Sequence, residues 1–183
     1  MFKCQAAGEQ RAFGGSWPNE GVAPAASLSS DTASVRSFVQ GFYDWYFPIA
    51  NKPPGGPAYF RVLQVRDSVL TPELAAALGG DSLAKERADP GDLEGLNGDP
   101  FLNSQDPYAP YEVTEIRQKG SNYAATVHPC HSADHAGDVA AEVTKQGPSW
   151  RFVNFFYETT DLRKVLCQYA KEAHDVAWQK ASC

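Results

Sequence analysis

The stretch Trp150-Arg151-Phe152-Val153-Asn154-Phe155-Phe156-Tyr157 decides the fold that the sequence predicts. In an extended strand, successive side chains point to opposite faces, so Trp150, Phe152, Asn154 and Phe156 would share one face. Both faces are then largely apolar, whereas a strand with one wet face alternates apolar with polar residues. We therefore expect a central β-strand that is covered on both faces, with Phe152, Val153 and Phe155 buried.

Three further strands are expected before this stretch, at Tyr111 to Arg117, at Tyr123 to His128 and at Asp138 to Lys145. Short turn-forming segments around Gly120 and Gly147 are typical of connections between antiparallel neighbours. The pattern indicates an antiparallel sheet of about four strands in a meander.

Helical periodicity flanks the strands on both sides. A first helix is expected from about Ser30, and Pro48 would end it because proline cannot continue helical hydrogen bonding. A second helical region covers Tyr59 to Leu78, with a fresh start at Thr71-Pro72, and Gly79-Gly80 would end it. Helices, a block of antiparallel strands and a last helix are the order of an α+β domain.

A last helix is expected after a cap at Thr159 or Thr160, continuing to the C-terminus. Cys167 and Cys183 would then lie about 24 Å apart at ~1.5 Å per residue, whereas a disulfide needs Cα atoms within about 7 Å. We therefore predict that these two cysteines do not pair, unless the helix ends early and the tail folds back. Any disulfide would instead tie Cys4 or Cys130 to the C-terminal segment.

The chain of 183 residues is expected to form a tail, residues 1–30, followed by a single α+β domain, residues 31–183. Its net charge of -6 and the lack of a basic cluster argue against nucleic acid as a partner. No apolar run reaches the ~20 residues of a membrane span, and no signal peptide is visible. Four cysteines favour a periplasmic or secreted location, with the cytoplasm as the alternative.

Four segments carry a resemblance to a known family. They are Phe42-Tyr43-Asp44-Trp45-Tyr46, Leu70-Thr71-Pro72-Glu73-Leu74, Asp99-Pro100-Phe101-Leu102-Asn103-Ser104-Gln105-Asp106, and Trp150 to Tyr157 followed by Asp161-Leu162. Together they resemble the bacterial domain-of-unknown-function family 3828, which is similar to the nuclear transport factor 2-like cone fold. The resemblance implies a curved antiparallel sheet packed against N-terminal helices and a C-terminal helix, with a cavity at its open end. It implies export or membrane anchoring for many members, and it supplies no catalytic residues.

The loop after the second expected strand carries imidazole and thiol groups, which are ligand types for zinc. The candidate ligands are His128, Cys130, His131 and His135. Their spacing matches no standard finger pattern, so the alternative is a polar loop tip. No glycine-rich phosphate loop or Cys-x-x-Cys pair is present, and we expect no cofactor.

Two further groups of polar residues are candidates for ligand binding. Asp99, Gln105 and Asp106 would lie at the cavity mouth, where one carboxylate could act as a general base; the alternative is that Asp99-Pro100 forms a turn. A second group would share one face of the sheet, namely Thr126, His128, Glu142, Thr144 and Asn154. Asn154 interrupts an apolar face, and a buried amide needs partners from the backbone, from a helix side chain or from a ligand.

These observations predict a non-catalytic binding or protein-interaction domain of the bacterial cell envelope, with an immunity-type partner of a toxin as a special case. The alternative is a cone-fold isomerase, dehydratase or hydrolase that uses acid–base groups in the cavity. The partner would be a protein or a small ligand, and the domain would be a monomer or a homodimer. Because bulky aromatic residues are available wherever a cone interior needs lining, we expect the cavity to be filled.

Overall fold

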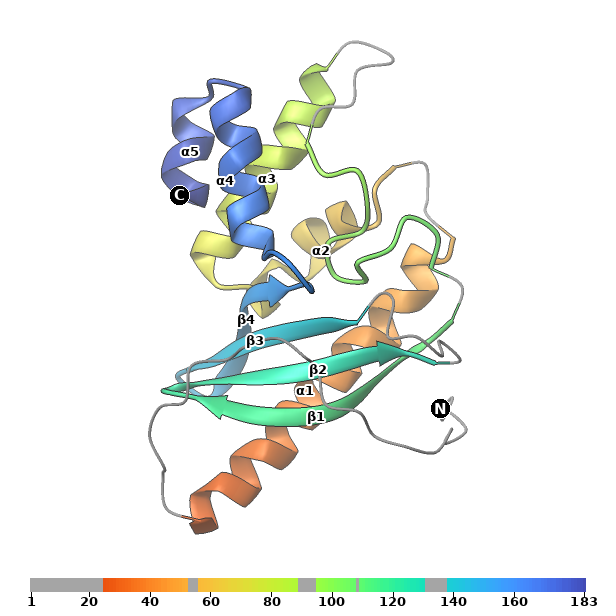
Figure 1. Ribbon diagram of the computed structural model, residues 1–183, viewed down its shortest axis with the longest axis vertical. Helices are drawn as coiled ribbons and strands as arrows, with labels where there is room; N and C mark the ends of the chain where they lie inside the picture. The colour runs from red at the N-terminus through yellow and green to blue at the C-terminus, as the bar shows by residue number, and fades with distance from the viewer. Residues whose placement is uncertain (1–24, 53–55, 89–94, 108, 131–137) are drawn as a thin grey trace.

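The computed structural model describes residues 25–52, 56–88, 95–107, 109–130 and 138–183. Most of the predicted tail, residues 1–24, and Cys4 with it, therefore lies outside the described residues. Helix α1 (Ala25–Ala50) starts earlier than expected and continues through Pro48 to Ala50, so the predicted end at Pro48 is wrong. Figure 1 shows α1 crossing behind a sheet, with the other helices gathered beyond one edge of it.

The sheet contains β1 (Tyr111–Lys119), β2 (Asn122–Pro129), β3 (Val139–Gln146) and β4 (Ser149–Phe156). Each strand pairs antiparallel with the next one along the chain, in the order β1-β2-β3-β4. Tight turns with glycine in the left-handed region, at Gly120 and Gly147, join β1 to β2 and β3 to β4. The predicted α+β class and the antiparallel meander are thus confirmed.

The space between α1 and the sheet is filled by aromatic rings. Phe42 of α1 lies with its ring centroid 4.8 Å from that of Phe152 and 5.3 Å from that of Phe101. Phe155 lies 4.9 Å from Phe101 and 5.0 Å from Phe152. All four side chains are buried, so this interior is a close-packed core, as the sequence predicted.

Strand β4 is not central, and the predicted position is wrong: β4 pairs with β3 alone among the strands and forms one edge of the sheet. The segment before α3 covers part of that edge. Leu70 forms a parallel bridge with Phe152, the Thr71 amide donates to the Phe152 carbonyl (2.9 Å), and Arg151 donates to the Leu70 carbonyl (3.2 Å). Phe152 and Phe155 are apolar because their rings pack against Phe42 and Phe101, which does not require a central position in the sheet.

A β-bulge in β4 changes which residues share a face. Asn154 pairs with Glu142 and Phe152 pairs with Val143, so Val153 is the extra residue. Phe152 and Phe155 therefore both face α1, while Asn154 faces the other side and does not interrupt the Phe152 face. Val153 is only half-buried, contrary to the prediction, because strict alternation ends at the bulge.

Beyond β4 lie α2 (Tyr59–Val65), a short 3-10 turn (Asp67–Val69) and α3 (Pro72–Arg87). The predicted start at Thr71 is confirmed, since its hydroxyl accepts a hydrogen bond from the Leu74 amide. The predicted end at Gly79-Gly80 is wrong. A Cβ atom on Gly80 would lie 2.1 Å from Trp178 Cδ1, so this glycine makes room for an indole ring inside a continuing helix.

The C-terminal helix ends early and turns back. Helix α4 (Leu162–Glu172) is capped by Asp161, whose side chain accepts from the Lys164 amide, and not by the predicted threonines. After His174 in the left-handed region, α5 (Val176–Ser182) runs back beside α4 (Figure 1).

The turn between α4 and α5 brings Cys183 to Cys167, with Cα atoms 4.9 Å apart in a disulfide. The prediction that these cysteines do not pair is therefore wrong, because its premise of one long helix fails. Cys130 is disulfide-bonded as well. Its bond does not reach the C-terminal cysteines, which are bonded to each other.

Candidate functional site

The Asp99–Leu102 segment is held by four tyrosine hydroxyls from distant parts of the chain. Each of its four residues receives one of them as a hydrogen bond. The pairs are Tyr46 with Asp99 Oδ2, Tyr157 with the Pro100 carbonyl (2.7 Å), Tyr43 with the Phe101 carbonyl (2.7 Å) and Tyr111 with the Leu102 carbonyl (2.9 Å). Two of these tyrosines come from α1, so the helix that fills the core also fixes this segment.

The Asp99 carboxylate closes a turn. Its Oδ1 accepts hydrogen bonds from the amides of Phe101 (2.9 Å) and Leu102 (3.1 Å), and its own amide donates to the Ser104 carbonyl (2.8 Å). Asn103, with φ of 47°, completes the reversal. The interpretation of Asp99-Pro100 as a turn is confirmed.

Asp99 also has an unusual acidity. Burial raises the pKa of its carboxyl group to about 6, against the lowering effect of the hydrogen bonds from Tyr46, Phe101 and Leu102. These three donors are neutral, and none of the ion pairs among the described residues includes Asp99. A carboxyl group with this pKa carries its charge over part of the physiological pH range and is protonated over the rest.

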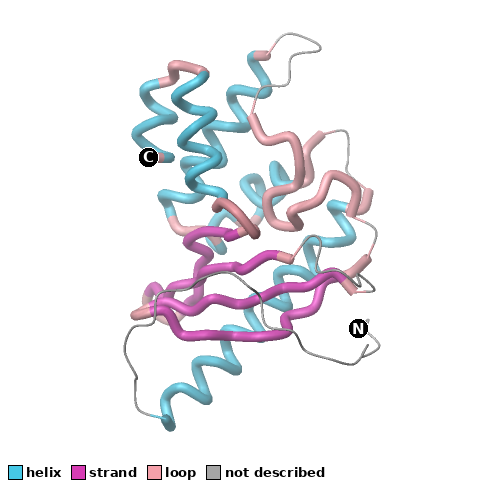
Figure 2. The backbone as a smooth tube through the Cα atoms, in the orientation of Figure 1, coloured by secondary structure: helices cyan, strands magenta, loops and turns pink. Residues whose placement is uncertain are grey.

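Asp99 lines a pocket of about 230 Å³, which we call the Asp99 pocket. It lies between the end of α1, the start of α2 and the loop of residues 95–107, drawn pink in Figure 2. The lining residues are Ala50, Gly56, Pro57, Ala58, Tyr59, Leu96, Asn97, Gly98, Asp99, Gln105 and Pro107. Of the three residues predicted at a cavity mouth, the structure brings Asp99 and Gln105 together here. Asp106 is exposed and is not part of the lining.

A second carboxyl–tyrosine pair supports the pocket wall. The Tyr59 hydroxyl donates to Asp81 Oδ2, and Asp81 Oδ1 accepts from the Leu96 amide (2.9 Å). Lys85 donates to the Leu96 carbonyl (2.6 Å), so α3 holds this part of the loop at both polar groups of Leu96. Burial raises the pKa of both Asp81 and Tyr59. Sequence reasoning missed Asp81, although an aspartate on the otherwise apolar buried face of α3 was a visible signal.

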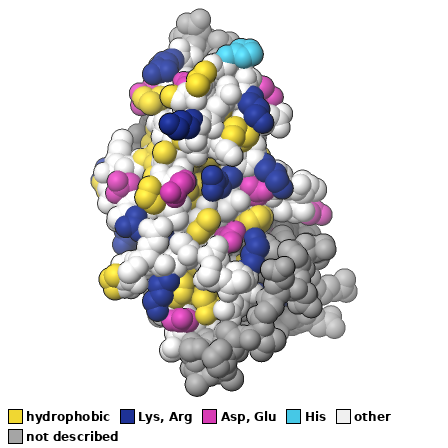
Figure 3. Space-filling model, turned by 90° about the vertical axis from the view of Figure 1, so that its left-hand side faces the viewer, with side chains coloured by type: hydrophobic (Ala, Val, Ile, Leu, Met, Phe, Trp, Pro, Cys, Tyr) yellow, Lys and Arg dark blue, Asp and Glu magenta, His cyan; other side chains and the backbone are white. Residues whose placement is uncertain are grey.

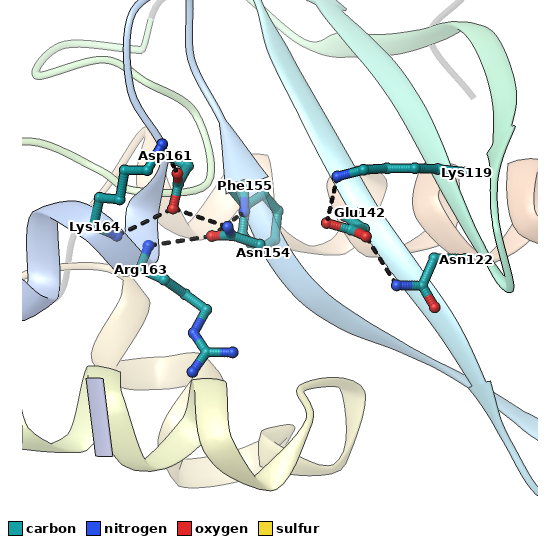
Figure 4. A network of polar contacts seen from close by, with 8 residues as sticks. All are labelled: Lys119, Asn122, Glu142, Asn154, Phe155, Asp161, Arg163 and Lys164. Carbon is teal, nitrogen blue, oxygen red and sulfur yellow. Dashed lines mark hydrogen bonds and ion pairs between the residues drawn. The ribbon is translucent and has the colours of Figure 1, made fainter. Parts of the chain in front are cut away.

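Asn154 is committed to the start of α4 (Figure 4). Its amide nitrogen donates to Asp161 Oδ1 (2.9 Å), and its oxygen accepts from the backbone amides of Arg163 (3.2 Å) and Phe155 (2.9 Å). Burial alone would raise the pKa of Asp161, but donors from Asn154 and Lys164 outweigh it and lower the pKa. The buried Asn154 amide thus finds its partners in the backbone and at the start of α4, and it positions that helix.

Glu142 pairs directly with Asn154 across β3 and β4, yet it belongs to a different network (Figure 4). Its carboxylate accepts from Asn122 (2.8 Å) and pairs with Lys119 Nζ (3.4 Å). The ammonium group of Lys119 also lies 4.6 Å from the centre of the Phe156 ring. The buried Glu142 side chain is therefore neutralised within the sheet.

The predicted grouping of polar residues on one sheet face is confirmed by the register. Thr126 pairs with Ala140, Glu142 pairs with Asn154, and His128 and Thr144 lie two residues from members of these pairs. This face is turned away from α1, so these residues line neither the aromatic core nor the Asp99 pocket. The predicted ligand-binding set is therefore split between two places.

The candidate metal ligands are only partly described. His128 Nδ1 lies 2.5 Å from Asp138 Oδ1, and Cys130 is disulfide-bonded, so its sulfur is not a thiolate ligand. His131 and His135 lie outside the described residues. Within the described part of the chain, no three histidine, cysteine, aspartate or glutamate side chains are arranged to hold a metal ion.

Comparison of the chain with models of protein families, with curated proteins and with solved structures found no match. The resemblance to the domain-of-unknown-function family 3828 and to the cone fold stays a prediction. In the part of the chain that the structure describes, none of the helices combines the length and apolarity needed to cross a bilayer.

Proposed function

We propose that this protein is a non-catalytic binding domain of the bacterial cell envelope, and that its ligand site is the Asp99 pocket. The observation that carries the proposal is that the aromatic core and the Asp99 pocket occupy separate regions of the molecule. Aromatic rings fill the region between α1 and the sheet, where a cone-fold enzyme would hold its substrate. The Asp99 pocket lies outside that region, with a polar wall held rigidly by tyrosine hydroxyls.

The location in the envelope is supported by the cysteines. Cys130, Cys167 and Cys183 are all disulfide-bonded, and such bonds persist in oxidising compartments. Figure 3 shows basic and acidic side chains interspersed with scattered hydrophobic ones on one face of the molecule. Such a mixed surface is typical of a protein that stays dispersed in solution. An immunity-type protein partner is one form of this proposal.

A second candidate function, an acid–base enzyme, is favoured by one observation. A carboxyl group that titrates at about pH 6 in a pocket is suited to general acid–base catalysis near neutral pH. Against this role, the described lining offers no histidine, lysine or second carboxylate to complete a catalytic pair. The neutral donors around Asp99 also serve the turn, so its hydrogen bonds have a structural purpose already.

The two candidates are separated by a fragment screen in solution. We would add small molecules to the protein and follow the side-chain amide signals of Asn97 and Gln105 by NMR, with Gln105→Ala to assign the second signal. Each fragment that binds would then be incubated with the protein for a day and its own spectrum inspected for conversion. Binding without conversion supports the binding domain. Conversion that is lost in Asp99→Asn and kept in Asp106→Asn, a matched exposed acid, would favour the enzyme.

A further inference from the structure

We propose that the Asp99 pocket takes the ammonium group of a small organic amine, with the Asp99 carboxylate as its counter-ion. This inference rests on the proposed function, since it names the chemical class of ligand for the same pocket.

Among the described residues, the Asp99 carboxylate has no cationic partner. Its hydrogen bonds come from one phenol and two backbone amides, all neutral, and it takes part in no ion pair with any described residue. An ionised carboxylate has about four lone-pair positions, and three donors leave room for one more. A partly buried carboxylate without a counter-ion is costly, so a ligand that brings a positive charge gains the most there.

The remaining polar side chains of the lining can each accept a hydrogen bond, and the Asn97 and Gln105 amides can donate as well. The Tyr59 hydroxyl gives its proton to Asp81, so its oxygen can only accept from a ligand. Asn97 and Gln105 each add an amide oxygen, and the described lining contains no basic side chain. An ammonium group, with three N–H donors and no acceptor, matches such a wall, whereas a carboxylate or phosphate ligand would face Asp99 without a positive partner.

The acidic sequence around the pocket also favours a cationic ligand. Between Arg87 and Arg117 the chain contains seven acidic residues and no lysine, arginine or histidine. The pocket residues Leu96 to Pro107 belong to this stretch. The resulting negative potential favours the approach of cations. The face in Figure 3 differs, because it carries both signs of charge.

The size of the pocket limits the ligand. Its volume of about 230 Å³ is below the ~300–1,000 Å³ of typical drug-sized sites, so a chain of a few carbons fits better than a large ligand. The apolar part of the lining, which includes Ala50, Ala58 and Leu96, would contact that carbon chain. We therefore expect a short alkylammonium group, either free or at the end of a larger molecule.

Cation binding should be coupled to the proton on Asp99. Since burial raises the pKa of Asp99 to about 6, an ammonium ion binds only to the ionised fraction, and affinity falls as pH drops below 6. The groups that face Asp99 are Tyr43 and Tyr46 of α1, Tyr59 of α2 and Tyr157 after β4. Their pKa values are all raised, so they stay neutral across this range. Asp81, whose pKa is also raised, contacts Tyr59 and is a second acid to control for.

The test uses three probes of similar shape and different charge: propylammonium, 1-propanol and propionate. Each is titrated into the full chain at pH 5 and pH 7.5 at equal ionic strength, and the Gln105 and Asn97 side-chain amides are followed by NMR. We expect propylammonium to bind about tenfold more weakly at pH 5, because only about a tenth of a group with pKa 6 is ionised there. Propanol should show no such pH dependence, and propionate should not bind at pH 7.5, where it is fully ionised.

Two variants make the test specific. Asp99→Asn keeps an oxygen for the Phe101 and Leu102 amides and should abolish both the preference for propylammonium and its pH dependence. Asp106→Asn removes a nearby exposed charge and should leave both unchanged. If Asp99→Asn does not fold, the pH dependence of the wild-type chain decides alone. Binding of all three probes with equal affinity would overturn the cation inference and keep the pocket as a site. Binding of none of them would overturn the pocket assignment as well.

Discussion

Helix α1 borders two regions of the molecule in which buried aromatic residues have different roles. On the sheet side, the rings of Phe42, Phe152 and Phe155 pack together and leave no polar group to satisfy. At its C-terminal end, the rings of tyrosines are buried as well, but their hydroxyls reach the Asp99–Leu102 segment and hold it beside a pocket. Tyr46 belongs to both regions, since its ring stacks on Phe42 at 5.3 Å and its hydroxyl bonds Asp99.

The difference shows what separates a core from a site in this fold. The core derives its stability from ring packing and excludes a ligand. The pocket keeps a carboxyl group whose charge nothing among the described side chains neutralises. Changes in the first region should therefore act on stability alone, and changes in the second on pH dependence and binding.

The largest expected effect is in the core. Phe155→Ala should lower the free energy of unfolding by about 3–5 kcal/mol, because Phe155 is fully buried among other rings. Urea denaturation measures the loss, and Val153→Ala, at the half-buried bulge position, is the control with a smaller expected cost. A loss below about 1 kcal/mol for Phe155→Ala would mean that this region is not close-packed.

Close packing extends to the contact between α3 and α5, where two neighbouring glycines provide a matched pair. Gly80→Ala should destabilise by about 1–3 kcal/mol, since a Cβ atom would overlap the Trp178 ring, whose indole also donates to the Ala77 carbonyl. Gly79→Ala meets nothing within 4 Å and should stabilise by about 0.5–1 kcal/mol through helix propensity. Thermal melts of both variants check the pair, and equal effects would contradict the packing.

The stability effect expected at Asp99 is smaller than the loss in the core, and it depends on pH. Its pKa is about 6 in the folded protein and ~3.9 in an unfolded chain, so the folded state binds more protons between these values. The stability it contributes is full below about pH 4 and is lost as pH rises through 6, by on the order of 1 kcal/mol after allowance for solvent screening. Denaturation between pH 4 and 7 should show this slope in the wild type. Asp99→Asn should reduce it and leave the part due to Asp81.

The sequence predicted the features that depend on local patterns. The strands and the cap at Thr71 follow from periodicity and turn residues, and the structure confirms them. The bulge at Val153 was not predicted, because one inserted residue leaves no local signature in the sequence. Gly80 looked like a helix end, although it accommodates a ring from a residue about 100 positions away.

The site was only half visible for the same reason. Asp99 and Gln105 stood out as polar residues in a turn-rich segment, but the partners that fix Asp99 come from α1 and from the region after β4. The four tyrosines are spread from position 43 to position 157, and only the folded chain brings them together. The early end of α4 was missed because Ala173 to Asp175 contains neither glycine nor proline, although Asp175 is a good helix cap.

The most direct test of the account is the titration of the Asp99 side-chain carbon by carbon-13 NMR, with and without propylammonium. We predict a pKa of about 6 for the free protein, because burial opposes ionisation, and a lower value when the amine is bound, because the ammonium ion stabilises the carboxylate. Asp106 in the same spectra serves as the exposed reference. An Asp99 pKa near ~4 that propylammonium does not change would contradict the account.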